Sequence, residues 1–162
     1  MVIIMNNIIK IHLKDKEDYK NKYNEEILSY ELSNYILEET KGKSLKNNIK
    51  FSISTDFVLN NNDKENIVDM IRNNFGADIS EMINLQRKIR FASVLAFIIS
   101  LYLLFIYSLF KLIFVSDFIL IFSWLFMGES VCNFLYKELE YRYKIRRRKQ
   151  IVNAKVIFEK TN

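Results

Sequence analysis

The stretch Phe91–Tyr136, FASVLAFIISLYLLFIYSLFKLIFVSDFILIFSWLFMGESVCNFLY, decides how this chain folds. Its first part, residues 91–110, is uncharged, and a helix of that length is about 30 Å long, the thickness of a hydrocarbon core. Residues 118–136 form a second apolar run with one acid, Glu129. The link, residues 111–117, is too short for a domain. We therefore expect an antiparallel transmembrane hairpin. A buried hairpin of a soluble protein is the alternative, but such helices usually keep a more polar stripe.

Basic residues flank the two apolar runs on the same side of the expected membrane. Arg87, Lys88 and Arg90 precede the first run. The second is followed by Lys137, Arg142, Lys144, Arg146, Arg147, Arg148 and Lys149. The positive-inside rule therefore predicts that both termini are cytoplasmic.

The charge is distributed unevenly along the chain. Residues 1–86 carry 11 Lys or Arg and 14 Asp or Glu, whereas residues 137–149 carry seven basic and two acidic residues. The basic character therefore belongs to the segment next to the membrane, where each basic residue gains about 1 kcal/mol near anionic lipid. Attraction to lipid is the simpler explanation. Binding of a nucleotide or an oligonucleotide is the alternative, because tyrosines and basic residues alternate over residues 141–146.

The parts outside the hairpin predict one small α/β domain. Alternation of apolar and polar residues predicts three strands with one buried face, over residues 8–13, 49–55 and 154–159. Ser29 can cap a helix that runs to about Lys41, with an apolar stripe of Leu32, Tyr35 and Ile36. A second helix is expected over residues 65–75. Because three short strands need a covering layer, we expect the last strand to return to the sheet and the two helices to cover one face.

The junction between this domain and the membrane is expected to be helical. Gly76 is predicted to interrupt the second helix, and Asp78 with Glu81 fits a capping box that starts a new helix into the first span. The fold class is thus a membrane protein of α+β type. Its divisions are a cytoplasmic region of residues 1–90, a transmembrane hairpin of residues 91–136, and a basic helix with a final strand over residues 137–162.

Two motifs carry a resemblance to other proteins. The second run contains Trp124 and Glu129 in WLFMGES, and the tail reads YKELEYRYKIRRRKQIVNAKVIF. In this the chain resembles a widespread bacterial group of small two-span membrane proteins of unknown function. The resemblance covers most of the chain and implies the same architecture in a bacterial cell membrane. Members of the group often carry a second acid where this chain has Cys132, and the group brings no known activity.

Glu129 is the main candidate site residue. An acid about 10 Å inside a span costs about 2.5 kcal/mol or more, so it normally faces protein or water. Asn133 lies one turn away on the same face. On the first helix, Ser93, Ser100 and Tyr107 recur every seven residues as a polar seam. In an antiparallel hairpin Ser100 is expected near the level of Glu129 and Ser93 near that of Asn133, so the two seams can meet within one chain or between chains.

Three interpretations of Glu129 stay open. It can lock the hairpin, line a pore or an interface between copies of the chain, or transfer protons. Two spans cannot enclose a water path alone, so a pore needs several copies, and a ring of acids would favour cations. Trp124 lies near the middle of its span and is expected to pack rather than to anchor at the interface.

The composition argues against an enzyme and against a bound metal or cofactor. His12 is the single histidine and Cys132 the single cysteine, too few for a structural zinc site. The chain has no glycine-rich phosphate loop and no nucleophile motif. A membrane enzyme that uses Glu129 has nothing further in its favour.

The function that we expect is that of a membrane effector or sensor. The cytoplasmic domain would bind a ligand, such as a nucleotide or oligonucleotide, or a protein, and control a homo-oligomer of hairpins that forms an ion channel or perturbs the membrane. Bacterial anti-phage effectors often have this design, so the argument is one of analogy. The alternative is a non-conducting membrane anchor that holds a cytoplasmic protein partner.

Overall fold

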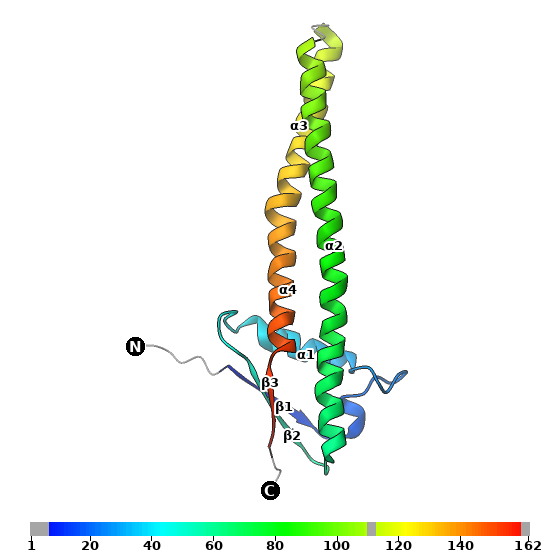
Figure 1. The fold of residues 1–162 in the computed structure, drawn as a ribbon, viewed down its shortest axis with the longest axis vertical. Coiled ribbons are helices and arrows are strands. Elements are labelled where there is room, and N and C mark those ends of the chain that lie inside the picture. Colours follow the sequence, from blue (N-terminus) through cyan, green and yellow to red (C-terminus); the bar gives the residue numbers. More distant parts are fainter. Residues whose placement is uncertain (1–6, 110–112, 160–162) are drawn as a thin grey trace, which may run out of the picture. The chain divides into compact units, whose positions relative to one another are not determined.

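The computed structural model describes residues 7–109 and 113–159, as one small sheet and several helices (Figure 1). A 3₁₀ turn at Lys16–Asp18 and a π-helix at Asn133–Lys137 complete the regular structure. The main elements, in chain order, are β1 (Ile8–Leu13), α1 (Tyr30–Lys41), β2 (Lys50–Thr55), α2 (Asn61–Leu109), α3 (Ile113–Cys132), α4 (Glu138–Val152) and β3 (Lys155–Phe158).

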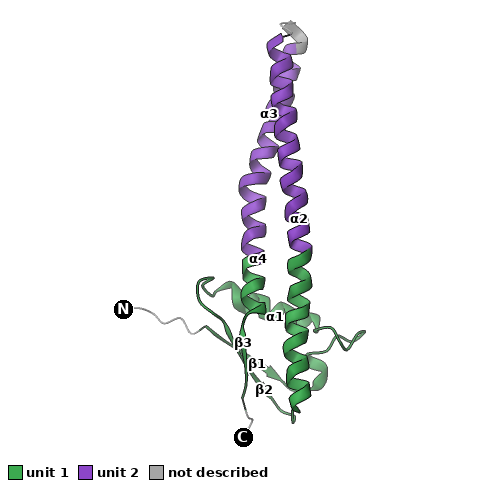
Figure 2. Ribbon diagram, in the orientation of Figure 1, with its two compact units in different colours: residues 1–80, 146–162 green, residues 81–145 purple. Residues whose placement is uncertain are grey.

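The chain divides into two compact units, which are coloured separately in Figure 2. Unit 1 contains residues 1–80 and 146–162, and unit 2 contains residues 81–145. Helices α2 and α4 each cross the boundary, so the chain both enters and leaves unit 2 as a helix.

Unit 1 is built on a parallel sheet of three strands in the order β1-β2-β3. Ile9 is paired with Phe51 across β1 and β2, and Phe51 with Val156 across β2 and β3. All three predicted strands are confirmed. Parallel strands cannot be joined by a tight turn, so each pair needs a crossover. Helix α1 provides the first crossover, and everything from Asp56 to Ala154, including unit 2, forms the second.

One face of the sheet carries the core of unit 1. Residues of β1 alternate between exposed and buried, and the buried ones belong to the same cluster as apolar side chains of the helices. Ile36 of α1 and Phe75 of α2 are fully buried in it. The predicted strand residues in this cluster are Ile9, Ile11, Leu13, Ile49, Phe51 and Ile53, with Val156 and Phe158 packed against it. The sheet is therefore covered by helices on the face that the alternation predicts.

Helix α1 begins and ends as its sequence predicts. The Ser29 hydroxyl accepts a hydrogen bond from the backbone N–H of Leu32 (3.3 Å), and Gly42 follows the last turn. The prediction for Tyr35 is wrong. Its side chain is 44% exposed, and its hydroxyl donates to the carbonyl oxygen of Lys10 (2.9 Å). A tyrosine at the edge of a core satisfies its hydroxyl in this way while its ring stays half in solvent.

Helix α2 corrects the expectation of a break at Gly76. It runs without interruption from Asn61 to Leu109, and Asp78 is not a helix cap. Instead, Asp78 accepts a hydrogen bond from Arg148 of α4 (2.8 Å). A single glycine costs a helix only about 1 kcal/mol relative to alanine. The buried Ile67, Ile71 and Phe75 hold the preceding turns against the core, which stabilises the helix on that side.

Candidate membrane-embedded site

Unit 2 contains the two longest apolar helical segments that the structure describes. Helix α2 and the helical run Ser116–Val152 are both long and apolar enough to cross a membrane. In their most apolar windows only 11% and 17% of the residues are buried inside the protein. The core helices of a soluble protein would bury most of such a window.

The large apolar side chains of these helices point away from the helix pair. Phe91 is 71% exposed and Trp124 is 68% exposed. The same holds, at 43% to 64% exposure, for Val94, Leu95, Phe97, Ile98, Leu101, Tyr102, Phe105, Leu109, Phe118, Ile121, Phe122, Leu125 and Val131. Trp124 therefore contributes to this outer surface.

The line along which α2 and α3 meet is polar. Ser130 donates a hydrogen bond from its hydroxyl to the carbonyl oxygen of Ser93 (2.8 Å), and Ser123 donates to that of Ser100 (3.0 Å). The hydroxyl oxygens of Ser100 and Ser123 are 3.5 Å apart. All four serines are 6% exposed or less. We call Ser93, Ser100, Ser123 and Ser130 the serine seam.

The serine seam shows that the two helices are antiparallel and close. Along each helix the two serines are seven residues apart, the interval at which a residue returns to the same face of a paired helix. Small residues at such a line allow two backbones to approach, and a hydroxyl there can bond to the carbonyl of the facing helix. The distribution of polarity is therefore the reverse of that in a soluble coiled coil, with serine inside and phenylalanine outside.

The predicted pairing of this seam with Glu129 is wrong. Ser100 lies opposite Ser123, and Ser93 lies opposite Ser130. The reason is the position at which the second helix begins. Helix α3 starts at Ile113, so residues 113–117 of the predicted link are helical. Residues 111 and 112 of that link lie outside the described part of the chain. Because α3 starts earlier than predicted, each residue of α2 lies opposite a different residue of α3. Tyr107, the third member of the predicted seam, is 36% exposed.

Glu129 and Asn133 occupy different environments, although the sequence predicts that they share one face of the second span. Asn133 is 7% exposed, at the start of the π-helix. Glu129 is exposed on the outer surface of α3, and the described residues give it no hydrogen bond or ion pair. The hairpin-lock interpretation of Glu129 therefore finds no supporting contact among the residues that the structure describes.

A charged cluster lies at the end of the apolar segment where both flanks are basic. The Glu138 carboxylate is 4% exposed, and its Oε1 accepts from Nη2 of Arg90 (2.7 Å) and from Nη2 of Arg142 (2.6 Å). Arg142 also donates from Nε to the same oxygen (3.1 Å). Glu138 therefore ties α2 to α4 through two arginines, and we call these three residues the Arg90–Glu138–Arg142 cluster.

The π-helix explains why the acid lies at this position. Continued at intervals of seven, the seam of Ser123 and Ser130 would place Lys137 between the helices. The turn Asn133–Lys137 is wider than an α-helical turn and holds one more residue, so Glu138 takes that place instead. Sequence reasoning missed Glu138, because periodicity assumes an unbroken α-helix.

The pKa of Glu138 reflects two opposing effects. Burial of the carboxyl raises its pKa, but the hydrogen bonds from Arg142 and Arg90 and the charges of both arginines outweigh burial and hold the pKa below its usual value of 4.5. The carboxylate is therefore ionised at neutral pH.

We expect the Arg90–Glu138–Arg142 cluster to weaken in acid. Because the folded-state pKa of Glu138 is lowered, its contribution to stability is fully present above about pH 4.5 and is lost as the pH falls through the folded value. Thermal unfolding of the detergent-solubilised protein between about pH 6 and about pH 3 measures this loss. The Glu138→Gln variant should lack this pH-dependent loss of stability. An equal fall in unfolding temperature for both proteins as the pH drops below about 4.5 would contradict the expectation.

The other predicted basic residues differ in exposure and in their partners. Arg87, Lys88, Arg146 and Lys149 are exposed. Lys144 pairs with Glu140 (2.5 Å), and Arg148 pairs with Asp78 (2.8 Å). Arg147 is 5% exposed and donates to Gln150 (2.9 Å). Several of the basic residues near the apolar helices are thus already paired with partners of the same chain.

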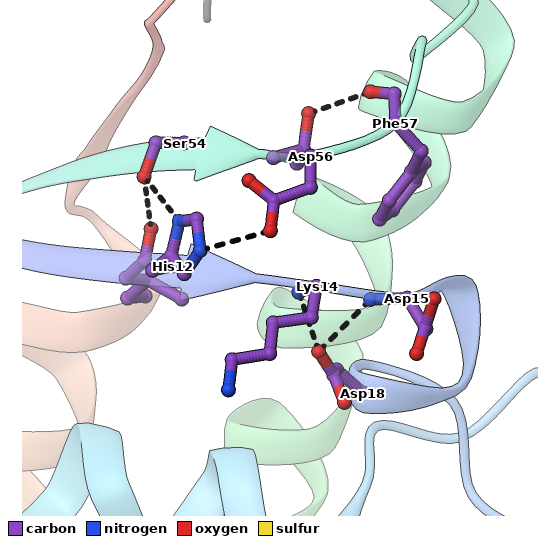
Figure 3. A network of polar contacts seen from close by, with 9 residues as sticks. His12, Lys14, Asp15, Asp18, Ser54, Asp56 and Phe57 are labelled. Carbon is purple, nitrogen blue, oxygen red and sulfur yellow. Dashed lines mark hydrogen bonds and ion pairs between the residues drawn. The ribbon is translucent and has the colours of Figure 1, made fainter.

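A second polar cluster lies in unit 1, where β1 and β2 end (Figure 3). His12 Nδ1 is 3.1 Å from the Ser54 hydroxyl, and His12 Nε2 is 3.2 Å from the Asp56 carboxylate. Both His12 and Asp56 are about half exposed. The Ser54 hydroxyl also lies 3.5 Å from the carbonyl oxygen of Ile11, which it can reach as a donor. Sequence reasoning missed the partners of His12, because they lie 42 and 44 residues along the chain.

The described residues contain no group of three or more His, Cys, Asp or Glu side chains that could hold a metal ion. Comparison of the chain with protein-family models, with curated proteins and with solved structures finds no match.

Proposed function

We propose that the chain is a two-span protein of the bacterial cell membrane, in which residues 91–110 and 118–136 form a transmembrane hairpin. The observation that carries this proposal is the reversed polarity of unit 2, with the serine seam inside and large apolar side chains outside. In water such a pair would expose more than a dozen large apolar side chains. In lipid the same surface is solvated, and the seam satisfies its own hydrogen bonds.

The proposed orientation places both termini in the cytoplasm. Arg87, Lys88 and Arg90 flank the first span on the side where the second span is followed by α4 and its basic residues. Basic residues close to the ends of a span are retained on the cytoplasmic side. The α/β unit is then a cytoplasmic domain.

We further propose that several copies associate in the membrane through Glu129. This acid lies on the outer surface of α3 without a partner among the described residues. An acid on a lipid-facing surface costs about 2.5 to 3.5 kcal/mol on insertion scales. Association of hairpins removes that cost when Glu129 faces other copies or water between them. A ring of such acids would conduct cations in preference to anions.

The α/β unit is the sensor in this proposal. Both of its connections to unit 2 are helices, so a change in the unit is transmitted along α2 and α4. Small two-span proteins with a cytoplasmic sensing domain are a frequent design of anti-phage effectors, which is an analogy of architecture. The ligand would be a nucleotide, an oligonucleotide or a protein.

A membrane anchor is the second candidate. The observation in its favour is the outer face of the sheet, where Lys10, Lys50 and Lys155 are exposed. A cytoplasmic protein could bind there while the hairpin only holds it at the membrane. An anchor of this kind needs neither an oligomer nor conduction.

The mass of the protein in detergent separates these candidates. Retention in membranes washed with alkaline carbonate first tests insertion. Light scattering, with the detergent contribution subtracted, then gives the number of chains. A discrete assembly of four or more chains is expected for the effector, because fewer hairpins leave no space for a water path. A monomer would overturn the channel and favour the anchor.

A further inference from the structure

The Arg90–Glu138–Arg142 cluster has the composition of an anion site rather than of a balanced ion pair. Two guanidinium groups share one carboxylate, which leaves one positive charge in excess. Both arginines donate to the same oxygen, Oε1, so the two hydrogen bonds hold their Nη2 atoms close to each other. The other oxygen, Oε2, is buried and accepts no hydrogen bond from the described residues. The acid thus gathers both cations at one point.

The two arginines keep donors for a further ligand. Arg90 and Arg142 are 51% and 53% exposed, although the acid beneath them is 4% exposed. Arg90 uses Nη2 for Glu138, and Arg142 uses Nε and Nη2, so a terminal Nη1 of each is not used in this cluster. Guanidinium groups bind phosphate through parallel N–H groups, and donors that are already fixed lose less entropy on binding.

The place of the cluster along the chain selects the source of that phosphate. Arg90 immediately precedes the first apolar run, and Glu138 follows the second by two residues. If these runs span a bilayer, the cluster lies at the level of the cytoplasmic headgroups. The exposed Phe91 and Tyr136, at 71% and 73%, are next to it and would contact acyl chains at that level.

We propose that Arg90 and Arg142, held by Glu138, bind the phosphate of a net-anionic phospholipid at the cytoplasmic border of the hairpin. This inference rests on the membrane insertion proposed above. Basic pockets between membrane helices on the cytoplasmic side bind anionic headgroups by this chemistry. The bound lipid would balance the excess charge of the cluster and contact α2 and α4 at once.

Native mass spectrometry of the full chain tests the site. The probes are dioleoyl phosphatidylglycerol and dioleoyl phosphatidylcholine, which share the phosphate but differ in net charge. The measurement is made at about 0.5 M salt, where charges are screened within about 4 Å and diffuse attraction is weak. Wild type is expected to prefer phosphatidylglycerol about tenfold, and Arg90→Gln or Arg142→Gln should remove that preference.

Two further variants separate a built site from general charge. Arg146→Gln removes the same charge from an exposed arginine one turn beyond Arg142, and should change the preference by less than about twofold. Arg142→Lys keeps the charge and an ammonium for Glu138 but loses the planar fork, so it should lose most of the preference. Full preference in Arg142→Lys, or equal losses in Arg146→Gln and Arg142→Gln, would overturn the site.

The remaining outcomes are also decisive. Displacement of phosphatidylglycerol by inorganic phosphate at equal concentration would assign the site to a free anion and overturn the lipid. Retention in carbonate-washed membranes is measured on the same preparations. A retained protein without lipid preference overturns this site alone, whereas release of the wild type overturns the membrane proposal with it.

Discussion

A chain that ends at Val152 should lose a large part of the stability of its α/β unit. Removal of β3 exposes one edge of the central strand β2. It also removes Val156 and Phe158, whose side chains pack against the core. Partial burial of one valine and one phenylalanine, with the lost strand pairing, contributes on the order of 4 kcal/mol. A domain of this size has about 5 to 10 kcal/mol in total, so the truncated unit should keep only about 1 to 6 kcal/mol and be cleaved much faster by protease.

Limited proteolysis and circular dichroism measure this loss, and a chain that ends at Glu159 is the matched control. That control keeps all of β3, the backbone hydrogen bond from Glu159 to Ile53 (2.9 Å) and the contact between the side chains of Glu159 and Ser52. It should unfold like the full chain. An unchanged protease-resistant core in the chain that ends at Val152 would show that β3 is dispensable and contradict the role assigned to it.

Glu129→Gln should abolish most of the cation preference of the proposed channel while the protein is still made and inserted. The substitution keeps the size and the hydrogen-bonding capacity of the side chain and removes its charge. If acids from several copies line the water path, loss of that ring should lower the ratio of cation to anion permeability about tenfold, and growth arrest on overexpression should weaken with it.

Planar bilayer recording and membrane depolarisation in cells provide the two measurements. Asp117→Asn removes the same charge from an exposed acid at the opposite end of the second span, and should leave the permeability ratio within about twofold. Equal conductance and equal growth arrest for wild type and Glu129→Gln would remove Glu129 from the pore. The membrane hairpin itself would survive that result, because it depends on the serine seam and not on Glu129.

Local sequence patterns were sufficient for most of the secondary structure. Alternation predicted each of the three strands, and the Ser29 cap and Gly42 located both ends of α1. The two apolar runs are helical, the first within α2 and the second across α3 and the π-helix, because a long apolar stretch has few alternatives to a helix. Where a pattern failed, tertiary contacts outweighed it. Gly76 does not end α2, because the helix loses less stability from one glycine than it gains from the packing of Phe75 and from the Arg148–Asp78 pair.

The candidate site was less predictable than the elements that carry it. The seven-residue repeat of Ser93 and Ser100 marked a polar seam correctly, but its partners are Ser123 and Ser130 and not Glu129. The register of two antiparallel helices depends on where the second helix starts, and α3 starts five residues before the apolar run that predicted it. An error of that size changes every pair along the seam.

Local patterns alone were enough to predict that the two apolar runs are helical, that basic residues flank both runs at the ends away from their link, and where the three strands lie. These properties depend on neighbours within a few residues, so local periodicity and composition are enough to predict them. The tertiary structure alone decided that the strands are parallel with β2 in the centre, that the seam pairs serine with serine, and that the π-helix turns Glu138 towards Arg90. These depend on contacts between residues far apart in the chain, and no local pattern encodes which distant partner will satisfy a given polar group.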